Sequence, residues 1–172
     1  MKEPLRPTAA NLAHQPFFHG MAWNHLETLA SVAGRTAAVE GTLLFTENEA
    51  ADFFYCILSG KVAIEAVSSG KTLQIQVLEA GDVLGWSWMF PPHQWHFSAR
   101  AIEPVTLFFF DGKNLRERCE DDPALGFALM KRLTAVVLDR LQATRHRLAV
   151  VQQAAAGIPI RIAPLAPSGE GH

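Results

Sequence analysis

The sequence is poor in the features that mark secreted, membrane-spanning and metal-binding proteins. Its two cysteines, Cys56 and Cys119, lie far apart in 172 residues and match no metal-ligand spacing, which predicts free thiols in a reducing compartment. No apolar run approaches the roughly 18 residues of a membrane span. The first residues, MKEPLRPTAANL, lack the apolar core of a signal peptide. We therefore expect a cytoplasmic protein that is not associated with a membrane.

Charge of one sign and catalytic motifs are scarce as well. The formal net charge of −2 gives the chain no overall attraction to nucleic acid. No P-loop is present, and Gly85–Met89 lacks the final glycine of a nucleophile elbow. A cupin-type metalloenzyme would need a His-x-His pair, which is absent. A cupin-like β-barrel enzyme therefore stays an unfavoured alternative, and we expect a protein that is not an enzyme.

The chain does have enough apolar sequence for one domain with a sizeable core. Hydrophobic residues make up 49% and charged residues 19% of the chain. Residues 1–10 hold two prolines and no periodicity, which predicts a flexible arm. Residues 11–33 have a helical pattern that is interrupted near Gln15-Pro16. The spacing of Asn24 and Glu27 resembles an N-terminal helix cap, and Gly34 is expected to end the helix.

Between Thr36 and Gly112 the apolar residues follow a period of two. Val62 and Ile64 alternate with more polar positions, and Ser68–Lys71 is typical of a hairpin turn. Short strands of this kind are expected at residues 43–45, 53–58, 62–66, 73–77, 97–102 and 105–110. Many short strands at this spacing predict a β-sandwich or barrel between the helical segments.

The helical period returns in the last third of the chain. A long helix is expected to begin with Asp122 as its N-cap and Pro123 at its first position, and to end near Ala156. Residues 157–172 are predicted to be a disordered tail, which leaves 11–156 as the domain.

This helix carries an apolar stripe with a mean spacing of 3.5 residues, the period of a coiled-coil seam. In its first two turns Leu125, Phe127 and Leu129 make the helix apolar nearly all round, so that part is expected to cover the β-domain. Arginines flank the later turns, as suits a partner helix. We predict a homodimer through the stripe. The predicted interface consists of Met130, Leu133, Val137, Leu141, Thr144, Leu148 and Val151.

Residues 81–100, GDVLGWSWMFPPHQWHFSAR, form an aromatic insertion between predicted strands, where a ligand pocket is often found. The three tryptophans in it either line a pocket for a flat or apolar ligand or fill the cavity. His93 and His96 are half of a metal or haem site at most, because no nearby carboxylate or thiol completes it. We therefore expect no metal and no cofactor.

Several motifs resemble those of cyclic-nucleotide-binding domains. Residues 40–62, EGTLLFTENEAADFFYCILSGKV, are similar to the opening strands of that family, Gly81–Gly85 to the start of its phosphate-binding cassette, and Ala99–Glu103 to the strand that follows. The resemblance covers about residues 12–153 and is greatest to the sensor half of catabolite-activator-type bacterial regulators. It implies an α+β fold, namely an antiparallel, jelly-roll-like β-roll with N-terminal helices and a long C-terminal helix.

Two positions depart from the family pattern. The family's ribose-binding glutamate follows the second cassette glycine, where this chain has Trp86. Its phosphate-binding arginine precedes a small pair, where this chain has Trp95 or, in a second alignment, Phe97. A cyclic phosphate is normally held by a bidentate arginine and backbone N–H groups. The departures therefore imply weak or no binding of cAMP and cGMP, with Arg100 as a fallback donor.

The resemblance thus implies a sensor or regulatory domain that binds an unidentified small molecule or protein. The alternative is a dimeric interaction scaffold that binds no ligand. About nineteen residues follow Gln153, too few for the helix-turn-helix domain of such regulators, so we expect no binding to nucleic acid. The candidate pocket residues are Gly81, Leu84, Gly85, Trp86, Ser87, Trp88, Trp95, Phe97, Ser98 and Arg100.

Overall fold

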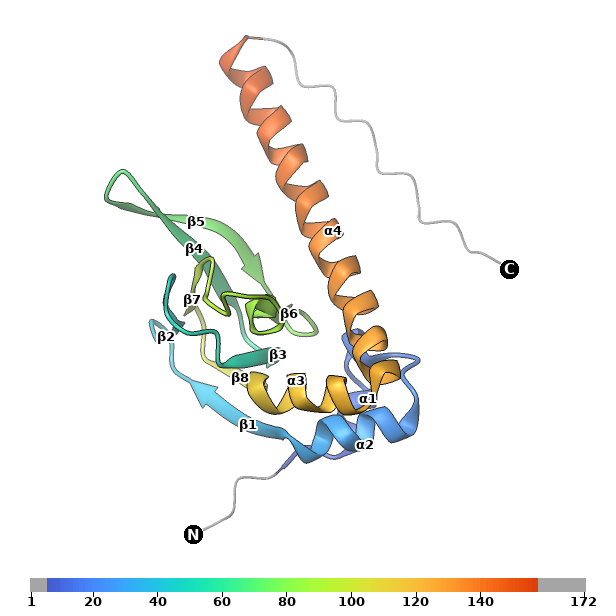
Figure 1. Ribbon diagram of the computed structural model, residues 1–172. Helices are drawn as coiled ribbons and strands as arrows, with labels where there is room; N and C mark the ends of the chain where they lie inside the picture. Colours follow the sequence, from blue (N-terminus) through green and yellow to red (C-terminus); the bar gives the residue numbers. More distant parts are fainter. Residues whose placement is uncertain (1–5, 158–172) are drawn as a thin grey trace. The chain divides into compact units, whose positions relative to one another are not determined.

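The computed structural model describes residues 6–157, which belong to two units that meet between Arg132 and Leu133. The first unit contains two four-stranded sheets and every helix up to the start of the last one (Figure 1). The second unit is the continuation of that last helix. Within the described residues no helix is long and apolar enough to cross a membrane.

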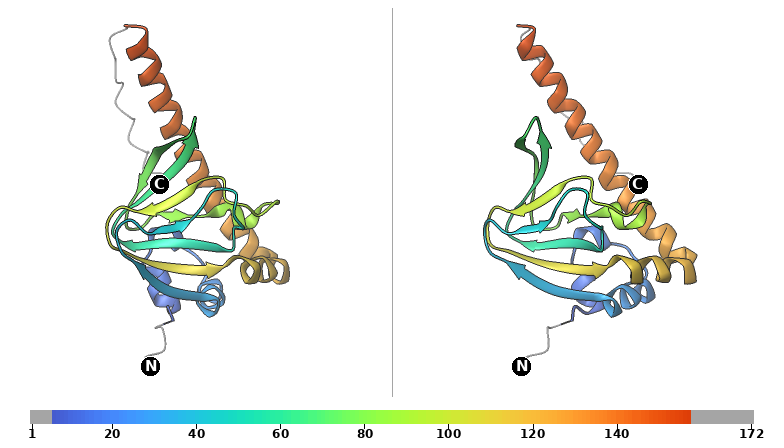
Figure 2. Two further views of the ribbon diagram at one scale, coloured as in Figure 1. Left: turned by 90° about the vertical axis from the view of Figure 1, so that its left-hand side faces the viewer. Right: turned by 60° about the vertical axis from the view of Figure 1, so that its left-hand side comes forward.

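The strands of the first unit pair antiparallel throughout and form a β-roll. One sheet has the order β1-β8-β3-β6 and the other has the order β2-β7-β4-β5. In both views of Figure 2 the tip of the β4–β5 hairpin extends past the other strands. The predicted α+β fold with an antiparallel β-roll is confirmed. The described strands are β1 (Ala33–Ala38), β2 (Leu43–Phe45), β3 (Phe53–Ser59), β4 (Val62–Ser68), β5 (Lys71–Leu78), β6 (Val83–Leu84), β7 (Ser98–Ala101) and β8 (Val105–Asp111).

A hydrophobic core fills the space between the two sheets. Alternate residues of each strand point into it, because strand side chains alternate between faces. Each fully buried aliphatic or aromatic side chain contributes about 1.5–3 kcal/mol to folding. The core cluster contains Phe45, Ala51, Tyr55, Ile57, Val62, Ile64, Leu78, Leu84, Trp95, Ala99, Ala101, Val105 and Leu107.

Helices cover the other face of the β1-β8-β3-β6 sheet. Phe17 packs on Phe54 and Phe18 packs on Phe110, with ring centroids 5.4 and 5.7 Å apart. Phe54 and Phe110 are paired residues of β3 and β8, so one aromatic layer joins the helices to the sheet. The helices are α1 (Ala9–Ala13), the 3-10 helices η1 (Pro16–Phe18) and η2 (Trp86–Met89), α2 (Trp23–Ser31), α3 (Gly112–Asp121) and α4 (Pro123–Ala155).

The N-terminal region differs from the sequence prediction in three details. Helix α1 begins at Ala9, inside the segment predicted to be an arm, because Thr8 and Asn11 form a capping box. Helix α2 has Ala22 as its N-cap, so Asn24 is not a cap, and Glu27 instead accepts a hydrogen bond from the indole of Trp23. Gly34 does not end a helix but lies in β1.

Strand β1 was not predicted, because its sequence, AGRTAA, contains one β-branched residue and no aromatic residue. It forms through tertiary pairing. All six of its residues pair with β8, from Ala33 opposite Phe110 to Ala38 opposite Val105. Pairing with a strongly apolar neighbour therefore outweighs the weak local preference.

Helix α4 begins as predicted. The carboxylate of Asp122 accepts hydrogen bonds from the backbone N–H groups of Ala124 and Leu125. The prediction that the first turns are buried all round is wrong for Phe127, which is 71% exposed, whereas Leu125 and Leu129 are buried. Most of the predicted tail, 158–172, lies outside the described residues.

The predicted interface residues of α4 differ in exposure. Leu133 is buried, and the other six are exposed. The large apolar residues among the exposed ones are Met130, Val137, Leu141, Leu148 and Val151.

Candidate functional site

The candidate site begins where β6 ends and the chain turns into η2. Gly85 makes this turn with a φ of 84°, in the left-handed region that favours glycine. The preceding Leu84 is fully buried and pairs with Tyr55 of β3, which ties the turn to the sheet. Gly81, at the start of the cassette, lies against Pro16 of η1. The two glycines of the sequence pattern therefore occupy separate surroundings.

Trp95 lies directly over Gly85 and fills the interior of the roll there. A Cβ atom on Gly85 would lie 2.7 Å from Cζ3 of the Trp95 ring. The ring also stacks on Phe45, with centroids 3.9 Å apart, and Trp95 is 4% exposed. Its backbone N–H donates to the carbonyl of Glu49, and its carbonyl accepts from Asn48. One of the two positions that the family pattern can give to its arginine is thus occupied by a fixed, buried ring.

The other cassette tryptophans lie elsewhere. Trp88 is fully buried and packs on Phe54, on the helix-covered face of the sheet rather than between the sheets. Its carbonyl accepts a hydrogen bond from the guanidinium of Arg116 on α3. Trp86 is half-buried and follows Gly85 directly. Of the three tryptophans, only Trp95 belongs to the core cluster.

The two histidines of the insertion differ: the side chain of His96 has a hydrogen-bonding partner, whereas the imidazole Nδ1 of His93 is buried with no partner among the described residues. His96 Nδ1 lies 3.0 Å from the buried Ser87 Oγ, within hydrogen-bonding distance. The carbonyl of His93 accepts a hydrogen bond from the N–H of Ala51. Among residues 6–157, no group of three or more His, Cys, Asp or Glu side chains is arranged to hold a metal ion.

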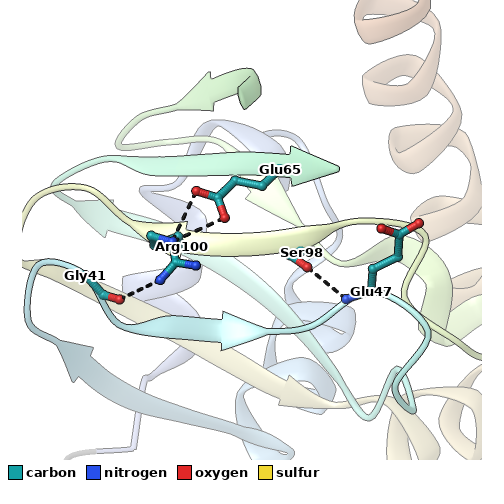
Figure 3. A network of polar contacts seen from close by, with 5 residues as sticks. All are labelled: Gly41, Glu47, Glu65, Ser98 and Arg100. Carbon is teal, nitrogen blue, oxygen red and sulfur yellow. Dashed lines mark hydrogen bonds and ion pairs between the residues drawn. The ribbon is translucent and has the colours of Figure 1, made fainter. Parts of the chain in front are cut away.

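Arg100 belongs to a polar network on the outer face of the second sheet (Figure 3). Its Nε donates to both carboxylate oxygens of Glu65, at 3.1 and 3.2 Å, and its Nη1 donates to the carbonyl of Gly41. Ser98, on the same face of β7, accepts a hydrogen bond from the N–H of Glu47. Their neighbour Ala99 is in the core. Strand alternation therefore directs Arg100 and Ser98 away from the interior.

The structure thus brings only part of the predicted list together. Leu84, Gly85 and Trp95 meet between the sheets, and Phe97 packs against the same core. Trp88, Ser98 and Arg100 lie on other faces. The arrangement at Gly85 leaves no charged side chain of the predicted list directed at the cassette interior, which suits apolar packing more than the binding of an anion.

A cavity that the sequence did not indicate lies on the inner side of the first sheet. It measures about 200 Å³ and is lined by Thr36, Phe53, Tyr55 and Phe109. Burial, and secondly the carboxylate of Asp52, raise the pKa of Tyr55 to about 12. The period of two in the sequence predicted β3 and β8. It did not predict β1, so nothing in the sequence indicated that Thr36 lies beside these strands.

Cys56 is a core residue rather than a reactive one. It is fully buried, and burial, with a smaller contribution from Asp82, raises the pKa of its thiol to about 12. The thiolate is the nucleophilic form of cysteine, so this side chain is a poor nucleophile at neutral pH. Both Cys56 and Cys119 are free thiols, as predicted.

Comparisons with known proteins agree with the β-roll fold. The family model described as "Cyclic nucleotide-binding domain" matches residues 36–122, just over half of the chain. A candidate cyclic nucleotide-binding protein of Geobacter metallireducens has a solved structure with a TM-score of 0.70. It is 30% identical and aligns with 82% of this chain and 99% of its own.

Two further relatives are more distant. The CRP-like cAMP-activated global transcriptional regulator of Mycobacterium tuberculosis is 27% identical over 139 residues, and this chain, 80% of which is aligned, spans 60% of its length. The regulatory subunit of a cAMP-independent protein kinase A from Trypanosoma brucei shares the fold with a TM-score of 0.66. It is 16% identical over 80% of this chain and 48% of its own. On the family match and the Geobacter relative, the chain belongs to the cyclic nucleotide-binding domain family.

Proposed function

We propose that this chain is a non-enzymatic regulatory domain whose nucleotide site is closed by its own Trp95. In this proposal the domain binds cAMP and cGMP weakly or not at all. Its regulatory signal is instead a protein partner or a different ligand. The observation that carries the proposal is the Trp95 ring, which lies on Gly85 and stacks on Phe45. A cyclic phosphate at this position would have to displace a buried indole from the core.

Electrostatics support the same proposal. Arg100, the fallback donor, is already bound to Glu65 and to the carbonyl of Gly41. Helix η2 has only four residues, Trp86–Met89, so it offers few aligned N–H groups to an anion. Losing a charged hydrogen-bond partner costs a few kcal/mol, or a factor of about 10² to 10⁴ in affinity. We therefore expect dissociation constants for both nucleotides no better than about 10⁻⁴ M.

A fold relative supports the idea that few side chains decide the outcome. The Trypanosoma brucei regulatory subunit is described as cAMP-independent, yet a form with three substitutions was solved with cAMP bound in one site. One of these substitutions introduces an arginine. Position 95, or position 97 in the second alignment, is where the family pattern expects an arginine in this chain.

Titration calorimetry with cAMP and cGMP tests the proposal. The wild-type protein should show no micromolar binding. The double variant Trp86→Glu, Trp95→Arg should gain affinity, because it restores an acceptor for the ribose and a cation for the phosphate. A matched control, Trp23→Arg, changes an exposed tryptophan and should gain nothing. Micromolar binding by the wild type would sink the proposal, and a folded double variant without any gain would show that the cassette is misaligned.

We also propose that a second copy of the chain covers the apolar stripe of α4. The exposed residues of the stripe keep the 3.5-residue spacing of a two-helix seam, and a globular protein rarely leaves such a row in water. Val137 and Leu141, 38% and 53% exposed, lie in its middle. A ligand-free dimeric scaffold is the second candidate function, and this surface favours it.

Light scattering at micromolar protein concentration tests the dimer. The variant Val137→Asp, Leu141→Asp should be monomeric, because it places charges in the seam. The control variant Ala135→Asp, Gln142→Asp adds the same charge at exposed positions off the stripe and should stay dimeric. A monomeric wild-type protein would contradict the proposal. A cytoplasmic location, which two free thiols suit, remains part of the same proposal.

A further inference from the structure

The cavity beside β1 adjoins the cassette but is not the space at Gly85 that Trp95 fills: Tyr55 pairs with Leu84, and a Cβ on Gly85 would lie 3.1 Å from the carbonyl oxygen of Phe53. Its lining residues come from β1, β3 and β8, whereas the cassette lies between β6 and β7. Phe53 and Phe109 meet edge to face, with centroids 5.7 Å apart and planes at 88°. Phe53 and Tyr55 are 6.1 Å apart and tilted by 51°. Three rings in different planes therefore form the walls of a small box that is open to solvent.

Gly34 contributes to the shape of this box. A Cβ atom at Gly34 would lie 2.3 Å from Cζ of Phe109, so the ring can lie across β1 only because this residue has no side chain. The φ of Gly34 is not in the left-handed region, unlike that of Gly85, so its small size is what matters. The ring thereby lies across the edge strand β1, at the rim of the cavity.

The electrostatics of the cavity favour a cation. None of the four lining residues is charged. The carboxylate that acts on the Tyr55 phenol belongs to Asp52, which precedes Phe53 outside β3, so that strand alternation does not turn it away from the cavity. Arg35, the cation next to Thr36 on β1, lies on the opposite face because strand side chains alternate. Aromatic faces attract cations through the ring quadrupole, and a nearby carboxylate adds to this attraction.

We propose that this aromatic cavity binds a small organic cation with a methylated or quaternary ammonium group. The rings of Phe53, Tyr55 and Phe109 contact the methyl groups, Asp52 supplies the counter-charge, and the hydroxyl of Thr36 is available to a polar end of the ligand. The volume of about 200 Å³ corresponds to about seven water molecules at ~30 Å³ each. A group of about seven to ten non-hydrogen atoms therefore fills this volume.

Choline and its uncharged isostere 3,3-dimethylbutan-1-ol are the probes for the test. They share their shape, so a difference between them isolates the charge. Binding is followed by the methyl and aromatic proton signals in nuclear magnetic resonance titrations of the whole chain. Choline should bind about fivefold to thirtyfold more tightly than the isostere. This ratio corresponds to about 1–2 kcal/mol of cation–π stabilisation. Equal or tighter binding of the isostere overturns the ammonium assignment, and binding of neither overturns the site.

Three variants locate the site. Thr36→Trp adds a ring at an exposed position that borders the cavity and should abolish binding, whereas Ala37→Trp, on the opposite face of the same strand, should leave it unchanged. Asp52→Asn should weaken choline about threefold or more and leave the isostere unaffected. Choline binding that survives Thr36→Trp, or that is lost equally in Ala37→Trp, would place the cation elsewhere.

This proposal and the closed nucleotide site fail independently. The choline titration of the wild-type protein tests the cation site, and the cAMP titration tests the closed site. The Trp86→Glu, Trp95→Arg variant is not a choline control, because Trp95 stacks on Phe45 and Phe45 stacks on Tyr55. If that variant gains cAMP and the wild type binds no choline, only the cation site is wrong. If choline binds and the wild type also binds cAMP at micromolar concentration, only the closed site is wrong.

Discussion

Two glycines in the roll each carry an aromatic ring, and they differ in what the ring does. At Gly85 the ring is Trp95, which is buried and stacked on Phe45. At Gly34 the ring is Phe109, which is half-buried and borders an open cavity. In both places an aromatic ring packs on a glycine. The Trp95 ring fills the space at Gly85, whereas the Phe109 ring leaves a cavity open beside Gly34.

The difference has a physical basis in the two surroundings. Gly85 lies between two sheets, where Trp95 meets core side chains on both sides. Gly34 lies in β1, which is an edge strand of its sheet, so no further strand covers Phe109 on that side. A ring in a closed core contributes its full transfer energy, whereas a ring at an edge keeps part of its surface in water.

Replacing each ring by alanine should give the largest effect. We expect Trp95→Ala to lower the free energy of unfolding by about 3–5 kcal/mol, because it leaves a cavity in the core. Phe109→Ala should cost about 1–2 kcal/mol, because its cavity is already open to water. Urea denaturation at fixed protein concentration measures both. Equal losses of unfolding free energy would show that the two rings are equally packed, which would contradict the difference proposed between them.

Adding a methyl group to each glycine should give the next effect. Gly85→Ala should cost about 2–3 kcal/mol, since it strains a left-handed backbone and pushes on a fixed ring. Gly34→Ala should cost about 1 kcal/mol or less, because the ring it meets can turn into the cavity. The same denaturation series measures this, and choline binding should fall in Gly34→Ala alone. A larger loss at Gly34 would contradict the view that Phe109 is free to move.

Much of this fold follows from local pattern. The period of two in β4 and the turn at Ser68–Lys71 appear in the structure as a hairpin in which Ser69 and Gly70 both have positive φ. Asp122 caps α4 through its own side chain, which sequence reveals directly. The sequence alone also predicts that the family's charged positions are taken by Trp86 and by Trp95 or Phe97.

What sequence could not supply is the direction of side chains between elements far apart in the chain. Arg100 follows the small pair that marks the cassette, yet its partner Glu65 is 35 residues away on another strand. Trp88 is as aromatic as Trp95, but it packs beyond the sheet, on Phe54. The cavity needs β1, which pairs because of β8 and not because of its own residues. Each of these depends on tertiary register, which a single sequence does not encode locally.

The assignment of Arg100 to the outer face predicts a smaller effect. Arg100→Ala should lower the free energy of unfolding by about 1–2 kcal/mol, because it leaves the carboxylate of Glu65, whose side chain is 13% exposed, without its partner. The matched control Lys61→Ala breaks a more exposed pair with Glu103 and should cost 0–1 kcal/mol, that is, about the value of a surface pair. Arg100→Ala should leave nucleotide and choline titrations unchanged. A change in either would mean that Arg100 reaches the interior.

The smallest effect concerns the phenol in the open cavity. Tyr55 is the only tyrosine of the chain, so the ultraviolet absorbance of tyrosinate reports on it alone. Its pKa is raised to about 12 by burial first and by Asp52 second. The folded state therefore keeps a proton that the unfolded chain loses near pH 10, and this contribution to stability is lost as the pH rises from about 10 to about 12.

A fast pH jump, read before the chain unfolds, should thus show little tyrosinate below about pH 11. Asp52→Asn should lower the pKa of Tyr55, because it removes the negative charge that disfavours the phenolate, whereas Glu103→Gln, on the exposed pair with Lys61, should not. An unchanged pKa in Asp52→Asn would mean that the carboxylate does not act on the cavity. The ammonium proposal would then have to rest on the three rings alone, and the expected preference for choline over its isostere would shrink to the cation–π contribution.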